Sequence, residues 1–193
     1  MKEIVFLDIE TTGLEHYHKI FEVAIIGKDF VYEQLVQIPP EQMEFADPVA
    51  LEITSFSERD FSGAITQRQL AIELADLLKN KIIVAHNVNF DCNMIEELLF
   101  NHGINYSFHN RKIDTIAIAF EHLSVLGLHS LSLSAIRTFF GWSQEHAHSA
   151  LSDAKDVQRL YNKLARCTWL DRLFWRYRFV CTKLLKKLKT SLK

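Results

Sequence analysis

The stretch Ile4-Val5-Phe6-Leu7-Asp8-Ile9-Glu10-Thr11-Thr12-Gly13-Leu14 decides the fold of this chain and points to its chemistry. The first part of the stretch is apolar and β-rich, which is typical of a strand buried on both faces. Asp8 and Glu10 are two residues apart, so on an extended backbone both side chains lie on one face of the sheet and can share a metal ion. The stretch therefore predicts a buried strand that ends in paired carboxylates.

The patterns that follow predict an α/β fold. Residues 20–27 and 30–38 are strand-like and are joined by the turn Gly27-Lys28-Asp29, so the first three strands form an antiparallel meander. Residues 39–63 lack clean periodicity, which indicates loop with short helical pieces. Together the elements predict a mixed five-stranded sheet flanked by helices. The later elements are a helix from the N-cap Thr66 to 79, a strand at 81–85, a helix at about 89–102 ended by Gly103, a brief strand at Ile113, a helix at 131–140 ended by Gly141, and a helix at 150–166.

The composition is that of an ordinary globular protein. Of the 193 residues 48% are hydrophobic, and Gly and Pro are scarce, which argues against disorder and against a disulfide-stapled small fold. The three cysteines are odd in number and show no CxxC pairing, which favours a reducing compartment. The charged start Met1-Lys2-Glu3 and the early acids do not fit a signal peptide, and the apolar runs are shorter than the ~20 residues that cross a bilayer. We therefore expect a cytoplasmic protein.

The net charge of −2 hides a strong asymmetry. Residues 166–193 carry nine Lys or Arg and one acid, Asp171, for a net charge of +8. The remaining residues carry 13 basic and 23 acidic side chains, for a net charge of −10. This division predicts two parts with different electrostatic roles, a domain at 1–165 and a basic C-terminal helix at 166–193.

Two more motifs place acids at the start of predicted helices. His86-Asn87-Val88-Asn89-Phe90-Asp91 follows a strand, and His148-Ser149-Ala150-Leu151-Ser152-Asp153-Ala154 begins the last helix of the first 165 residues. In order and spacing the three stretches resemble the motifs of the DEDDh exonucleases, the family that includes the proofreading epsilon subunit of bacterial DNA polymerase III. The resemblance runs over most of residues 1–165 and implies a ribonuclease H-like fold with 3′–5′ exonuclease activity.

Clustered carboxylates suit phosphodiester hydrolysis. The reaction needs an activated water and a stabilised leaving oxygen, and two divalent ions roughly 4 Å apart meet both needs. Mg²⁺ prefers oxygen ligands, so Asp and Glu side chains are the expected cage. We therefore expect two Mg²⁺ ions, with Mn²⁺ as a substitute. Without metal these acids should repel one another and raise their own pKa values.

The resemblance assigns a role to each acid. It implies that Asp8 bridges both ions, that Glu10 and Asp153 hold the ion on the nucleophile side, and that Asp91 acts largely through a water. His148 matches the general base. An imidazole suits this step, because its ordinary pKa near ~6.5 leaves it able to accept a proton at pH 7.

The resemblance also assigns the substrate contacts. It implies that the turn formed by Thr11, Gly13 and Leu14 contacts the terminal nucleotide, with Leu14 wedged against the last bases. Asn87 and Phe90 would line the same pocket. Gly13 makes physical sense there, because the absence of a side chain lets backbone amides approach a nucleotide closely.

The carboxylates predict metal-dependent phosphodiester hydrolysis. The resemblance implies a 3′–5′ exonuclease that releases nucleoside 5′-monophosphates from single-stranded ends, and we expect DNA to be favoured over RNA. An RNA-trimming exoribonuclease and a non-catalytic nucleic-acid-binding or scaffold protein of the same fold are the alternatives. Proofreading and DNA repair share the same motifs and both stay open. Also open is whether His86 is a structural cap or a substrate contact. Asp114 is expected to be structural, and His146 a surface or loop histidine.

The basic C-terminal segment has the pattern of an amphipathic helix. Two interpretations stay open. The apolar stripe of this helix packs on the domain or on a second copy of the chain, or the segment binds another molecule. As a binding element it would follow nucleic-acid phosphates, or it would contact a membrane or a protein partner such as a polymerase. The apolar residues with helical spacing are Leu170, Leu173, Phe174, Tyr177, Val180, Leu184, Leu185 and Leu188.

Overall fold

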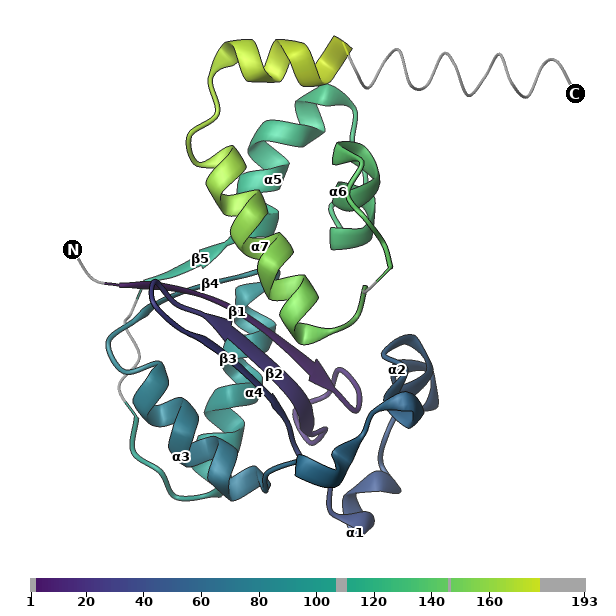
Figure 1. The fold of residues 1–193 in the computed structure, drawn as a ribbon, viewed down its shortest axis with the longest axis vertical. Helices are drawn as coiled ribbons and strands as arrows, with labels where there is room; N and C mark the ends of the chain where they lie inside the picture. Colours follow the sequence, from purple (N-terminus) through teal and green to yellow (C-terminus); the bar gives the residue numbers. More distant parts are fainter. Residues whose placement is uncertain (1–2, 107–110, 146, 178–193) are drawn as a thin grey trace, which may run out of the picture.

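A five-stranded mixed sheet forms the centre of the protein (Figure 1). The computed structural model describes residues 3–106, 111–145 and 147–177, and within these ranges the strand order is β3-β2-β1-β4-β5. β1 pairs antiparallel with β2, and β2 antiparallel with β3, whereas β4 is parallel to β1 and β5 parallel to β4. The predicted mixed sheet is therefore confirmed. The strands are β1 (Ile4–Thr11), β2 (Ile20–Ile26), β3 (Val31–Leu35), β4 (Ile82–Ala85) and β5 (Lys112–Asp114).

Helices cover both faces of the sheet (Figure 1). α3 and α4 lie against one face, and α7 lies across β1 and β2 on the other with α5 and α6 beside it. The short helices α1 and α2 belong to the connection between β3 and α3. The helices are α1 (Pro40–Met43), α2 (Pro48–Ile53), α3 (Gln67–Leu77), α4 (Val88–Asn101), α5 (Thr115–Leu123), α6 (Leu133–Phe140) and α7 (Ala150–Leu164), with 3-10 turns at Phe56–Glu58, Phe61–Gly63 and Ser124–Leu126.

The alternation of β1 places its acids on the α7 face. Val5, Leu7 and Ile9 are buried in the cluster formed with α3 and α4. Phe6 instead packs in the cluster that includes residues of α7. Because side chains alternate along a strand, Asp8 and Glu10 share the side of Phe6. The sheet therefore presents both carboxylates to α7.

Local signals set the helix ends. The hydroxyl of Thr66 accepts a hydrogen bond from the Gln69 N–H at 3.2 Å, so it is the N-cap of α3 as predicted. Gly141 ends α6 in the left-handed conformation, with φ of +71°, which glycine adopts without steric penalty.

Two elements differ from the sequence prediction. β3 ends at Leu35 rather than continuing to residue 38. The Val36 N–H still donates to the Phe21 carbonyl at 2.8 Å, but Val36 also forms an isolated parallel bridge with Ile65, to whose carbonyl the Gln37 N–H donates at 2.8 Å. The sequence pattern predicts no helix or strand for the apolar run 115–123, yet this run forms α5. The helix is capped by the Asp114 carboxylate, which accepts the Ile116 N–H at 2.8 Å, and packs against α7.

The C-terminal segment is helical over residues 169–177, as predicted. Trp175 is buried and makes an edge contact with Phe140, with ring centroids 5.4 Å apart. The apolar stripe points away from the domain: Trp169, Leu173 and Phe174 are 58–71% exposed. The rest of the predicted helix, residues 178–193, lies outside the described residues. Among the residues that are described, no helix is long and apolar enough to cross a membrane.

Candidate active site

Four acids and a histidine from the three sequence motifs converge beside the end of β1. Glu10, His148 and Asp153 each offer a ligand atom, and these atoms lie within 4.8 Å of one another. Asp153 lies in the first turn of α7 and Asp91 in the first turn of α4, as predicted. Asp8 and Asp91 are not part of the 4.8 Å group. They still belong to the same cluster, because the charges of Asp91 and Glu10 raise the pKa of Asp8, and the charge of Asp91 raises the pKa of Glu10.

The acids are unfavourable as a metal-free cluster. Burial raises the pKa of Asp8 well above its ordinary value, and the charges of Asp91 and Asp153 raise it further. Burial, with the nearby charge of Asp153, raises the pKa of Glu10 to about 8. Burial also raises the pKa of Asp91 to about 8. A positive ion among these groups would favour their charged forms, so the site is electrostatically suited to a cation.

Arg137 fixes one oxygen of Asp153. The arginine is 1% exposed, and its guanidinium donates to Asp153 Oδ1 and to Asp156 Oδ2, both at 2.6 Å. Burial raises the pKa of Asp153, and the Arg137 bond opposes that shift. Sequence reasoning missed Arg137. Arg137 could have been noticed in the sequence, because it is the single charged residue within the apolar helix Leu133–Phe140.

The His148 side chain is exposed at the edge of the cluster, and a hydrogen bond from another residue holds its main chain. Its φ of +65° is in the left-handed region, which is uncommon for a residue with a side chain. Arg59 donates to the His148 carbonyl at 2.7 Å and to the Thr54 carbonyl at 3.2 Å. Arg59 also pairs with Glu22 at 3.1 Å.

Glu22 connects this loop to the sheet. It lies directly opposite Glu10 in the β1–β2 register. One carboxylate oxygen accepts the Ala150 N–H at 3.3 Å and the Ser149 hydroxyl at 3.4 Å. An anion is favourable at this helix N-terminus, where backbone N–H groups lack partners. The sequence analysis did not identify Glu22 and Arg59 as site residues. Glu22 could have been noticed, because it is an acid inside the apolar strand 20–26.

The expected substrate residues differ in their exposure. Leu14 is 77% exposed, Asn87 is exposed with a φ of +74°, and Phe90 is half-buried. Thr11 is buried, and its hydroxyl donates to the Gly13 carbonyl at 2.7 Å, which fixes the turn. A Cβ on Gly13 would lie 2.4 Å from the His18 ring, so this position has no room for a side chain.

His86 and Asp114 have structural partners. The two ring nitrogens of His86 lie 3.0 Å from the Thr115 hydroxyl and 2.8 Å from the Leu131 carbonyl. Asp114 accepts the Asn87 N–H at 3.2 Å in addition to capping α5. Of the two readings for His86, the geometry supports the structural one. His146 lies outside the described residues.

The fold and this set of acids define a ribonuclease H-like nuclease. Solved structures share the fold: the zinc-bound form of the E. coli ExoI complex with single-stranded DNA superposes with a TM-score of 0.71 at 16% identity, covering 86% of this chain and 42% of that chain. The nuclease domain of 3′hExo bound to rAMP, a DEDDh family member, superposes with a TM-score of 0.63 at 14% identity, covering 82% of this chain and 89% of that chain.

The family model RNase_T, described as "Exonuclease", matches residues 5–161. This chain therefore belongs to the DEDDh 3′–5′ exonuclease family and carries an exonuclease domain. Among curated relatives, DNA polymerase III PolC-type of Pediococcus pentosaceus is 27% identical over 166 residues, and that of Thermotoga petrophila is 30% identical over 163 residues. Each match covers 81% of this chain and 11% of the relative, so the chain spans about a tenth of their length.

Proposed function

We propose that this chain removes nucleotides from the 3′ ends of single-stranded nucleic acid, in a reaction that depends on divalent metal. The observation that carries the proposal is the convergence of Glu10, His148 and Asp153 ligand atoms within 4.8 Å, beside the buried Asp8 and Asp91. A non-catalytic scaffold would have no need for so unfavourable a group of acids.

The residues present fit Mg²⁺. The donor set is rich in carboxylate oxygens, which Mg²⁺ and Mn²⁺ prefer. The raised pKa values of Glu10 and Asp91 show that negative charge is poorly compensated by the protein alone. We assign Asp8, Glu10, Asp91 and Asp153 as ligands. Two bound ions would supply Lewis acidity at the scissile phosphate and lower the pKa of water.

The chain's own groups supply the remaining steps. The His148 imidazole accepts the proton of the attacking water. Arg59 holds the His148 main chain, and Arg137 holds Asp153, so both groups meet the substrate with little reorganisation. The exposed Leu14 side chain contacts the terminal bases, and Asn87 and Phe90 line the nucleotide pocket.

DNA is the favoured substrate in this proposal. Its support is that the curated relatives are DNA polymerases and that one structural neighbour holds single-stranded DNA. The neighbour with rAMP supports the RNA-trimming alternative. Proofreading beside a polymerase fits the same relatives. The exposed stripe of residues 169–177 and the basic residues that follow would contact a polymerase, another protein or a membrane surface in the cytoplasm.

The test is digestion of 5′-labelled single-stranded DNA and RNA of one sequence with Mg²⁺, with Mn²⁺ and with EDTA. We expect a metal-dependent ladder that shortens from the 3′ end, faster on DNA. Asp153→Asn should abolish the ladder. Asp156→Asn is the matched control, because it also loses an Arg137 bond but lies outside the metal-ligand group. No ladder under either metal would refute the proposal.

A further inference from the structure

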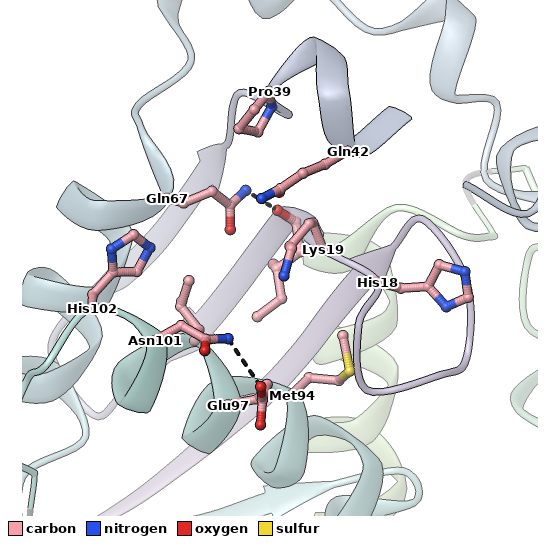
Figure 2. Close-up of a pocket in the computed structure, with 11 residues that line it drawn as sticks. His18, Lys19, Pro39, Gln42, Gln67, Met94, Glu97, Asn101 and His102 are labelled. Atoms are coloured by element: carbon pink, nitrogen blue, oxygen red, sulfur yellow. Dashed lines mark hydrogen bonds between the residues drawn. The ribbon is translucent and has the colours of Figure 1, made fainter. Parts of the chain in front are cut away.

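A cavity lies beside α4 (Figure 2). It measures about 360 Å³ and lies between α4, the start of α3 and the chain around Lys19 and Gln42. This volume is within the range of small-molecule sites, ~300–1,000 Å³. The α4 residue Asn101 lines it, and Asn101 lies roughly 15 Å along the helix axis from Asp91. Met94, three residues after Asp91, also lines the cavity, so the cavity extends along α4, and none of the four acids is among its lining residues.

Gln67 presents a fixed and unpartnered acceptor in this cavity. The residue is 8% exposed, and its amide nitrogen donates to the carbonyls of Ile20 at 2.8 Å and Gln37 at 3.1 Å. Both amide hydrogens are thus used, and the amide cannot be turned round without losing them. Its Oε1 is buried and accepts no hydrogen bond from the protein. Leaving such an acceptor unsatisfied costs ~1–3 kcal/mol, so an N–H or O–H donor is expected there.

A second acceptor lines the same cavity. The Oε1 atom of Gln42 is also buried without a protein donor. Figure 2 shows Gln42 and Gln67 side by side at one end of the cavity, with Asn101 and His102 across from them. Each of the Gln42 and Gln67 amides has a buried carbonyl oxygen without a protein donor, and such oxygens complement N–H donors, such as those of an amino group on a heteroaromatic ring.

Lys19 places one positive charge at the wall of the cavity, and the polar ring of His102 also lines it. Arg68 is close enough to influence His102. Burial lowers the pKa of His102, and the charges of Arg68 and Lys19 lower it further. Glu97 is the acid on the wall, and it is bonded to the Asn101 amide at 3.0 Å. An anionic group on the ligand would therefore be attracted.

We propose that this cavity binds a nucleoside monophosphate whose base carries an exocyclic amino group. The amino group donates to Gln42 and Gln67, and the phosphate lies near Lys19 and His102. The source is free nucleotide or a nucleotide within a strand, since both share this chemistry. The proposal depends on the cavity alone, and it stands or fails by direct binding rather than by hydrolysis.

The test is calorimetric titration of the full chain with dCMP in EDTA, which strips metal from the carboxylates. We expect saturable binding, and about tenfold weaker binding of dTMP, whose base offers a single N–H donor. Gln42→Leu should weaken dCMP binding about tenfold. Gln69→Leu is the matched control, because Gln69 is exposed on α3 and bonds Glu73 outside the cavity.

Three results would overturn the proposal. Binding that needs Mg²⁺ and is lost in Asp153→Asn would place the nucleotide at the carboxylates. Equal affinity of the Gln42→Leu variant and the unmodified chain would exclude the amide contact. No saturation with either dCMP or the dinucleotide d(CC) would show that the cavity binds no nucleotide with an exocyclic amino group. Hydrolysis of short DNA by Gln42→Leu should stay unchanged, which separates this site from the proposed active site.

Discussion

Replacing Arg59 by alanine should slow hydrolysis far more than it weakens substrate binding. Arg59 joins three elements: it bonds the carbonyls of His148 and Thr54 and pairs with Glu22 on β2. The left-handed backbone of His148 costs on the order of 1–3 kcal/mol, which these contacts offset. Once they are lost, the fraction of molecules with His148 in place should fall, and kcat should drop about ten- to hundredfold.

The same change should destabilise the fold. The Glu22 side chain is 3% exposed and that of Arg59 is 21% exposed, so the alanine variant leaves a buried carboxylate without its ion-pair partner. Breaking a buried pair costs ~3–5 kcal/mol, and the partial exposure of Arg59 places this case near ~3 kcal/mol. Urea unfolding measures this loss. Steady-state hydrolysis of a 5′-labelled oligonucleotide, at temperatures where each variant is folded, measures kcat and KM.

The double variant Arg59→Ala with Glu22→Gln separates stability from positioning. It removes the unpaired buried charge, so part of the unfolding free energy should return, while kcat should stay low because the His148 carbonyl still lacks its donor. Arg68→Ala, an exposed arginine on α3, is the control for charge and should behave as the unmodified chain. A wild-type kcat in Arg59→Ala, together with the loss of stability, would refute the positioning role.

Three further outcomes test other parts of the structure. In EDTA, the free energy of unfolding should fall as pH rises from about 4 to about 8. The pKa values of Glu10 and Asp91 are about 8 in the folded state, so between these pH values the folded state binds more protons than the unfolded state. Urea unfolding at several pH values checks this, and Mg²⁺ should remove the decline. Gly13→Ala should raise KM for oligonucleotides and lower the Tm, because the new Cβ would overlap the His18 ring; an unchanged Tm and KM would show that the turn adapts. Deletion of residues 178–193 removes six Lys or Arg, so binding of long single strands should weaken and lose salt dependence while short oligonucleotides are still hydrolysed; equal salt slopes before and after deletion would exclude a phosphate-binding role.

The sequence predicted the elements whose cause is local. The apolar, β-rich run of β1, the Thr66 cap and the glycine at the end of α6 depend on residues close in the chain, and each was found as predicted. α5 was missed because residues 115–123 carry no clear helical period, and packing on α7 is what its apolar side chains require.

The sequence by itself determined which acids belong to the candidate site, because Asp8 and Glu10 share a strand face, and Asp91 and Asp153 each begin a helix. Only the tertiary structure decided what holds them. Arg59 and Arg137 reach His148 and Asp153 across long separations in sequence, and no local pattern records such contacts. The physical reason is that burial makes an unpaired charge costly, so the partner is chosen by what the fold brings within hydrogen-bonding distance.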